Sequence, residues 1–111
     1  MAQYEARLKA RQAAEEKAKA LFLSCLTKEQ REQFGKDNSF KVTGSGKRNR
    51  YLVSCSSTVE NVYLTKRGKP VMMYCAGPRN TKIAWDIWLA QKLILESNEQ
   101  AFLKVAMHHP F

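Results

Sequence analysis

The most hydrophobic stretch of the chain lies near its end and is long enough for a long helix. Residues 83–106 read IAWDIWLAQKLILESNEQAFLKVA and include both tryptophans, Trp85 and Trp88. On a helical wheel the apolar residues cover much more than a narrow stripe, so we expect this helix to be buried on most of its circumference. The capping-box pattern at residues 97–100 predicts either two helices in line or one helix kinked at Ser97.

The N-terminal segment is also predicted to be helical, but it is mostly polar. Residues 2–19 are good helix formers, but their only large apolar side chains are Tyr4 and Leu8. From Ala20 onwards apolar residues recur at helical spacing. We therefore predict one continuous helix whose second half packs on the core, while its charged first half gains little from packing and projects. A capping box from Thr27 to Gln30 then predicts a short helix over residues 28–34 that stops at Gly35.

The middle of the chain alternates between apolar and polar positions, which is typical of strands. We predict four of them, at residues 40–43, 50–55, 62–65 and 71–75. The links between them are short and rich in Gly, Ser, Asn and Pro, which favours an antiparallel meander. The predicted fold class is therefore α+β: an N-terminal helix, a short helix, a four-stranded antiparallel meander, and a long C-terminal helix packed on the sheet.

Length and composition indicate a single domain. We place it at residues 21–107, after a charged helical extension at residues 1–20 and before a tail at residues 108–111 that we expect to be disordered. No apolar segment of the N-terminus has the form of a signal peptide, and no run is long enough for a membrane span. The three cysteines, Cys25, Cys55 and Cys75, are odd in number and widely spaced, which indicates a reducing, cytoplasmic compartment.

Charge is distributed unevenly. The chain has 19 Lys and Arg against 10 Asp and Glu, a net charge of +9, and residues 36–82 hold ten of the positive and only two of the negative charges. In a four-stranded meander the first and third turns lie at the same end of the sheet, so their cations are expected to gather there. These cations are Lys47, Arg48 and Arg50 in the first turn and Lys66, Arg67 and Lys69 in the third.

The surroundings of these turns suit a polyanion. Gly44, Gly46 and Gly68 would let the backbone approach a phosphate closely. Tyr51 and Tyr63 lie near the tips and are predicted to stack on bases. The alternative is that lysine and arginine at hairpin tips are simply solvated, and the sequence leaves both interpretations open.

We find no catalytic or metal site in the sequence, so we predict a protein that is not an enzyme and has no cofactor. Cys55, Cys75, His108 and His109 lack the close spacing of zinc ligands, so we predict no metal. The cysteines have no orienting acid for nucleophilic catalysis. Asp86 and Glu96 are ten residues apart on the long helix and do not form a catalytic carboxylate pair.

Four stretches carry a resemblance to a known kind of domain. They are residues 50–53, 61–62, 74–78 and the pattern over residues 89–106. Together they resemble a short domain of uncharacterised bacterial and bacteriophage reading frames, over about residues 20–106. The chain departs from that pattern at Gly77, where the domain often has His, which argues against a metal or catalytic role at this position. The resemblance implies a prokaryotic or phage source and no particular activity.

The leading hypothesis is a non-enzymatic nucleic-acid-binding protein, encoded by a phage, that contacts the phosphates of DNA or RNA through two basic hairpin tips. One alternative is a phage inhibitor or adaptor that binds an acidic host protein, with the N-terminal helix as its recognition element. Another is a virion-associated structural protein. The N-terminal helix could also form a homodimer. We expect no membrane partner.

Overall fold

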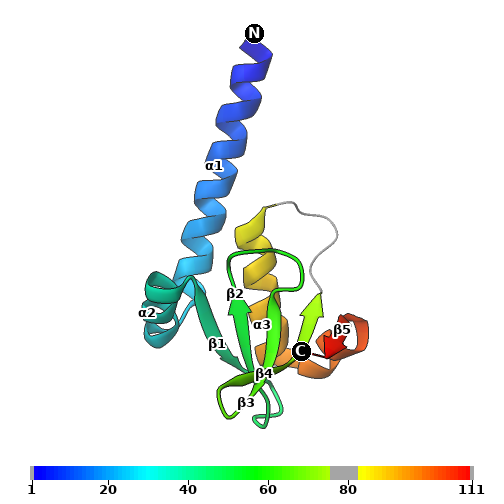
Figure 1. Ribbon diagram of the computed structural model, residues 1–111. Coiled ribbons are helices and arrows are strands. Elements are labelled where there is room, and N and C mark those ends of the chain that lie inside the picture. The colour runs from blue at the N-terminus through cyan, green and yellow to red at the C-terminus, as the bar shows by residue number, and fades with distance from the viewer. Residues whose placement is uncertain (1, 76–82, 111) are drawn as a thin grey trace.

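A five-stranded antiparallel sheet with helices on one face forms the body of the protein (Figure 1). The computed structural model describes residues 2–75 and 83–110. Along the chain the elements are α1 (Ala2–Cys25), α2 (Lys28–Asp37), β1 (Ser39–Thr43), β2 (Arg50–Ser54), β3 (Val62–Lys66), β4 (Lys69–Cys75), α3 (Ala84–Val105) and β5 (Met107–Pro110). The predicted α+β class, with its helix, short helix, meander and long C-terminal helix, is confirmed.

The strands lie in sequence order, β1-β2-β3-β4-β5, and each pairs with the next in antiparallel fashion. The predicted meander is thus correct, but the sheet has one strand more than predicted. The prediction of a disordered tail is wrong for residues 108–110, because β5 pairs with β4 and aligns His108 with Tyr74. The two rings lie 6.1 Å apart between centroids, so the tail gains both ladder hydrogen bonds and a ring contact.

The core lies between one face of the sheet and helices α1 and α3. At its centre Phe22 of α1 is fully buried, with aromatic rings from α2, β1 and α3 around it at centroid distances of 5.4–6.2 Å. These rings belong to Phe34, Phe40, Trp85 and Trp88. The predicted docking of the second half of α1 is therefore confirmed.

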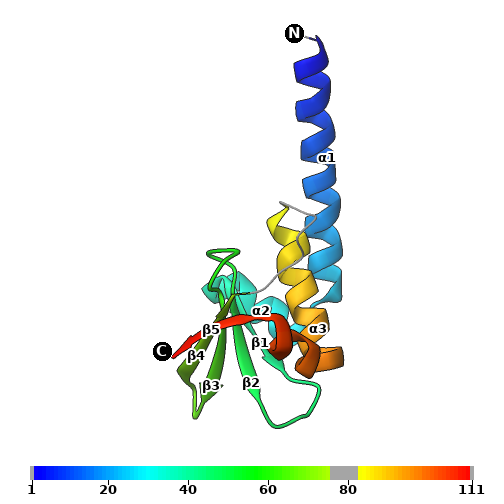
Figure 2. The same cartoon turned by 90° about the vertical axis from the view of Figure 1, so that its right-hand side faces the viewer.

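The first half of α1 leaves the body of the protein (Figure 2). This projection gives the molecule its elongated shape of 53 × 29 × 23 Å. Tyr4 and Leu8 are 69% and 45% exposed, whereas Ala18, lower on the same helix, is buried. The helix is continuous from Ala2 to Cys25, as predicted.

Helix α2 begins with the predicted capping box, in which Thr27 and Gln30 exchange side-chain-to-backbone hydrogen bonds. The predicted stop at Gly35 is wrong, because the helix continues to Asp37 and ends at Asn38, whose φ is 55°. Asparagine tolerates this left-handed conformation better than most residues. The Asn38 side chain also donates a 3.1 Å hydrogen bond to the carbonyl of Cys55, which holds the end of the helix against the sheet.

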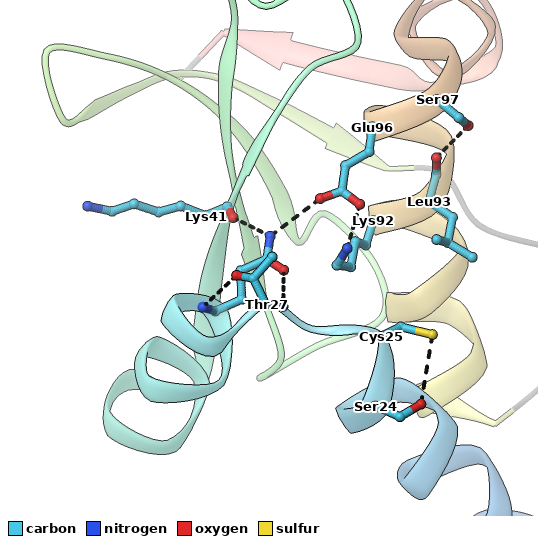
Figure 3. Close-up of polar contacts among 9 residues, drawn as sticks. Ser24, Cys25, Thr27, Lys41, Lys92, Leu93, Glu96 and Ser97 are labelled. Carbon is cyan, nitrogen blue, oxygen red and sulfur yellow. Dashed lines mark hydrogen bonds and ion pairs between the residues drawn. The ribbon is translucent and has the colours of Figure 1, made fainter.

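Two glutamine side chains of α2 form hydrogen bonds with the backbone of β1 along the edge that no other strand pairs with. Gln30 Nε2 donates to the carbonyl of Lys41 at 2.8 Å, and Gln33 Oε1 accepts from the Lys41 amide at 2.8 Å. Gln30 Nε2 also lies 3.5 Å from Glu96 of α3, which pairs with Lys92 one turn before it (Figure 3). Side chains of α2 thus supply β1 with the hydrogen-bond partners that a further strand would otherwise supply.

Helix α3 is kinked near the predicted position. The only non-helical residue within it is Asn98, with φ −154° and ψ 72°. Ser45 of the β1–β2 loop enters the gap, where its amide donates to the Leu95 carbonyl and its hydroxyl accepts from the Glu99 amide, both at 2.8 Å. The kink follows because Ser45 takes both partners of one i→i−4 hydrogen bond. The side chain of Asn98, one residue after Ser97, caps the second segment.

Burial of α3 differs between its two segments. From Ala84 to Glu96, Leu93 is the one exposed residue, so the predicted burial around most of the circumference is confirmed for this part. Beyond the kink only one side of the helix packs on the sheet, through Glu99 and Phe102, while Val105 is exposed.

Candidate nucleic-acid interface

The β1–β2 loop (residues 44–49) and the β3–β4 turn lie at the same end of the sheet. The register shows this, because Thr43 pairs with Arg50 at the base of the loop, and Arg50 in turn pairs with Thr65 of β3. The six cations predicted to gather there are exposed, and none of them forms an ion pair with another residue that the structure describes. We call them the tip cations: Lys47, Arg48, Arg50, Lys66, Arg67 and Lys69.

The two groups of tip cations are presented by different kinds of turn. Arg67 and Gly68 have φ values of 54° and 77°, so β3 and β4 are joined by a tight two-residue turn of the kind that favours glycine at its second position. The β1–β2 loop is longer, and Lys47 within it also has a positive φ, 63°. This loop curves towards the helices (Figure 2), and the amide of Ser45 within it donates to the Leu95 carbonyl of α3.

A buried carboxylate holds the β1–β2 loop in place. Glu99 of α3 is 2% exposed and accepts hydrogen bonds from the Gly46 amide at 3.1 Å, from Asn49 Nδ2 at 2.7 Å and from the Tyr51 hydroxyl. Burial by itself raises the pKa of the Glu99 carboxyl, but the hydrogen bonds from Tyr51, Asn49 and Gly46 outweigh it, so the pKa lies below its ordinary value. Glu99 therefore stays ionised and fixes the backbone that carries Lys47 and Arg48.

The glycines of this loop serve the contact with Glu99. A Cβ atom on Gly44 would lie 2.4 Å from the Glu99 carboxyl group, and the Gly46 amide donates a hydrogen bond to the same carboxyl group. The prediction that these two glycines admit a phosphate is therefore corrected: they admit the protein's own carboxylate. Gly68 has open space around it, with nothing within 4 Å of an added Cβ.

Tyr51 does not belong to the surface, so its predicted stacking role is corrected. It is 1% exposed and lies on the core face of β2, opposite Val42 and Leu64. Burial is the main cause that raises its pKa, and the hydrogen bond to Glu99 adds to it. Tyr51 thus supports the loop from within.

Tyr63 has the opposite orientation. Its neighbours in the strand, Val62 and Leu64, align with core-face residues, so alternation places Tyr63 on the other face of the sheet, where it is half-buried. The residues paired across the sheet with Tyr63 form one row on that face: Lys41, Leu52, Tyr63, Met73 and His109. We call the side of the sheet that carries this row the outer face. No helix that the structure describes covers it, and the strands lie in front of α3 in Figure 1.

Four residues of this row were not predicted to belong to the interface, namely Lys41, Leu52, Met73 and His109. The alternation of β1 contains the signal for Lys41, because Phe40 and Val42 point into the core and leave Lys41 on the opposite face. Figure 3 shows the Lys41 side chain pointing away from α3 and Glu96. Arg50 lies on the same face, in the next row, where it donates a 2.6 Å hydrogen bond to Thr43.

A hollow of about 620 Å³ lies between α2, the outer face of β1 and β2, and the β3–β4 turn. Its lining includes Lys41, Arg50, Leu52 and Thr65 of the sheet and Gly68 of the turn. Two carboxylates, those of Glu29 and Glu96, line it as well. The volume falls in the range of about 300–1,000 Å³ that is typical of ligand pockets.

The residues considered for metal binding or catalysis are dispersed. Cys55 is buried, which raises the pKa of its thiol to about 12, and Cys75 is half-buried on β4. His108 packs on Tyr74. Within residues 2–75 and 83–110, no three His, Cys, Asp or Glu side chains come together as ligands, and no helix is long and apolar enough to cross a membrane.

The comparisons with known proteins give no relative. No protein family matches this chain, and no curated protein or solved structure matches it either.

Proposed function

We propose that the protein is a non-enzymatic nucleic-acid-binding protein that holds the phosphates of DNA or RNA with the tip cations. The observation that carries this proposal is the gathering of six exposed Lys and Arg side chains at one end of the sheet, unpaired with any described carboxylate. Like charges at this density repel one another, and a polyanion relieves the repulsion while releasing its own counterions.

The acidic groups nearby offset only part of this charge. Glu99 is the carboxylate that contacts the β1–β2 loop directly. It is buried beneath the loop and accepts hydrogen bonds from three donors. Glu60 lies in the β2–β3 connection at the opposite end of the sheet. The potential outside the tips is therefore positive, which favours the approach of an anion.

The backbone beneath the tip cations is held firmly. The Glu99 carboxylate and Ser45 fix the β1–β2 loop against α3, and the β3–β4 turn has only two residues between paired strands. A prearranged backbone lowers the ordering cost of binding, so less of the electrostatic gain is lost. Phage origin and action in the cytoplasm remain part of this proposal, on the strength of the resemblance and of the free cysteines.

The projecting half of α1 favours a second candidate function, that of an adaptor or inhibitor bound to an acidic host protein. Tyr4 and Leu8 are exposed one helical turn apart, far from the core, and five of residues 2–20 are basic against three acidic. A helix that extends from its domain can pack on a partner's groove or on a second copy. A virion-associated role would use the tip cations in the same way, against packaged nucleic acid.

Salt dependence tests the leading proposal. If about four tip cations contact phosphates, the logarithm of the affinity should fall against the logarithm of the salt concentration with a slope of about −3 to −4. The double variant Lys47→Ala/Arg48→Ala should flatten the slope by roughly two units. Fluorescence anisotropy with a labelled oligonucleotide measures both.

The matched control is Arg7→Ala/Lys9→Ala, which removes the same charge from the exposed half of α1. The proposal requires this control to keep the wild-type slope. It fails if both double variants flatten the slope equally, because net charge alone would then account for binding. The adaptor hypothesis predicts instead a protein complex that survives the tip substitutions and is lost on deletion of residues 2–19.

A further inference from the structure

The middle of the outer face is apolar where water would favour polar side chains. Leu52, Tyr63 and Met73 lie side by side on adjacent strands, all half-buried, and no described helix covers them. An antiparallel sheet with one face on the core usually has a polar second face. A group of partly exposed apolar side chains that is ringed by polar ones is typical of a binding surface.

The charged side chains on the strands around this cluster are all positive. Lys41 lies beside Leu52 in the same row, and Arg50 lies in the next row towards the tip cations. The five strands together contain four Lys or Arg residues and no Asp or Glu. The two carboxylates that line the hollow, Glu29 and Glu96, belong to helices, and Glu96 is paired with Lys92. A partner for this face should therefore be anionic and should carry flat apolar groups.

The width of the sheet decides which nucleic acid can fit. Four gaps of about 4.8 Å separate the axes of β1 and β5, so the face is roughly 19 Å wide. The major groove of a DNA duplex is only about 12 Å wide and admits a helix or a two-stranded ribbon. Paired bases are thus out of reach of Tyr63 at the centre of the face, whereas the bases of a single strand can turn towards it.

On the basis of the proposed function, we infer that the outer face binds single-stranded nucleic acid, with one base stacked on Tyr63 and the flanking phosphates on Lys41 and Arg50. Leu52 and Met73 form the apolar floor on either side of the ring. Beyond the edge of the hollow, the cations of the β3–β4 turn contact further phosphates of the same nucleic-acid strand. Stacking tolerates any base, so sequence preference is weak.

The test compares three ligands of one length: a labelled single strand, its duplex, and an abasic strand that keeps the phosphates. Wild-type protein should bind the single strand roughly tenfold or more tighter than the other two. Tyr63→Ala should lose roughly tenfold for the single strand, in line with alanine substitution at other stacking sites, and nothing for the abasic strand or the duplex. DNA and RNA strands of the same sequence report the preference for the sugar.

Three variants make the test specific. Tyr63→Phe keeps the ring and should bind like wild type. Tyr63→Leu keeps an apolar side chain on the strand but no ring, so it should also lose roughly tenfold for the single strand. It serves as the test variant if Tyr63→Ala does not fold. Tyr4→Ala removes the exposed tyrosine of α1 and should change nothing.

Equal affinity of the wild type for all three ligands, or an unchanged affinity of Tyr63→Leu, overturns the inference. The proposed function survives that result if Lys47→Ala/Arg48→Ala still weakens binding. Absence of binding to every ligand removes the proposed function as well. A protein partner whose capture depends on Tyr63 would likewise overturn the inference, because the face would then be a protein interface.

Discussion

Replacing Glu99 by Gln removes the charge from a buried acceptor of three hydrogen bonds. The donors are Asn49 Nδ2, the Gly46 amide and the Tyr51 hydroxyl, which come from a loop and a strand far from Glu99 in sequence. A hydrogen bond to a charged group contributes about 1.5–3 kcal/mol, and one between neutral groups about 0.5–1.5 kcal/mol. A difference of about 1 kcal/mol for each bond gives an expected loss of about 3 kcal/mol in the free energy of unfolding at pH 7.

The loss should depend on pH in a defined direction. The pKa of the Glu99 carboxyl is lower in the folded protein than its ordinary value of 4.5, so the ionised form stabilises the fold. Such a contribution is fully present above the ordinary pKa and is lost as the pH falls through the lowered value. The difference between wild type and Glu99→Gln should therefore be constant above about pH 6 and should shrink below about pH 4.

Urea unfolding measures this difference, with the fluorescence of Trp85 and Trp88 as the signal. The matched control is Glu16→Gln on the exposed half of α1, which should stay within about 0.5 kcal/mol of wild type. A Glu99→Gln variant as stable as this control at pH 7, or a difference that persists undiminished at low pH, would refute the assignment of Glu99 as an ionised anchor.

Further predictions concern single positions. Gly44→Ala should cost about 1–3 kcal/mol in stability, because its Cβ would meet the Glu99 carboxyl group at 2.4 Å. Gly35→Ala should instead stabilise the protein by about 0.5–1 kcal/mol, because Gly35 lies inside α2 and an added Cβ meets nothing within 4 Å. Thermal melting measures both changes. Cys55 should resist alkylation at pH 8 in the native state, because burial raises its pKa to about 12, and should react after unfolding. Native tryptophan emission should be blue-shifted, because Trp88 is buried and donates its indole N–H to the Ser57 carbonyl at 2.9 Å; emission typical of water would contradict this placement.

Much of the fold could be predicted from the sequence because its signals are local. The capping box at Thr27, the change of character at Ala20 and the short turns between strands each depend on a few neighbouring residues. Strand β5 has no such signal: Met107–Pro110 contains two histidines and a proline, and it becomes a strand because the edge of β4 is available beside it. Pairing with a distant strand is a tertiary effect that propensity does not contain.

The candidate site was predicted less completely than the fold. The end of the sheet that holds the tip cations follows from the meander alone, so it could be predicted. The face on which each tyrosine lies depends on register, because neighbouring residues of a strand point to opposite faces. Tyr51 alternates in step with Val53, which is buried, and this could have excluded it from the surface. The role of Glu99 depends on the Ser45 contact at the kink of α3, which has no counterpart in local sequence.

The glutamines of α2 and the short fifth strand have a consequence for behaviour at high concentration. A sheet edge with a free row of amides and carbonyls is a template on which other molecules can add strands, the first step of many aggregates. On β1, both backbone groups of Lys41 are already occupied by Gln30 and Gln33. On the other side, β5 is only four residues long and ends at a proline, which has no amide to donate. Both edges of the sheet thus disfavour the addition of strands from other copies of the protein, which lowers its tendency to form fibrils at high concentration.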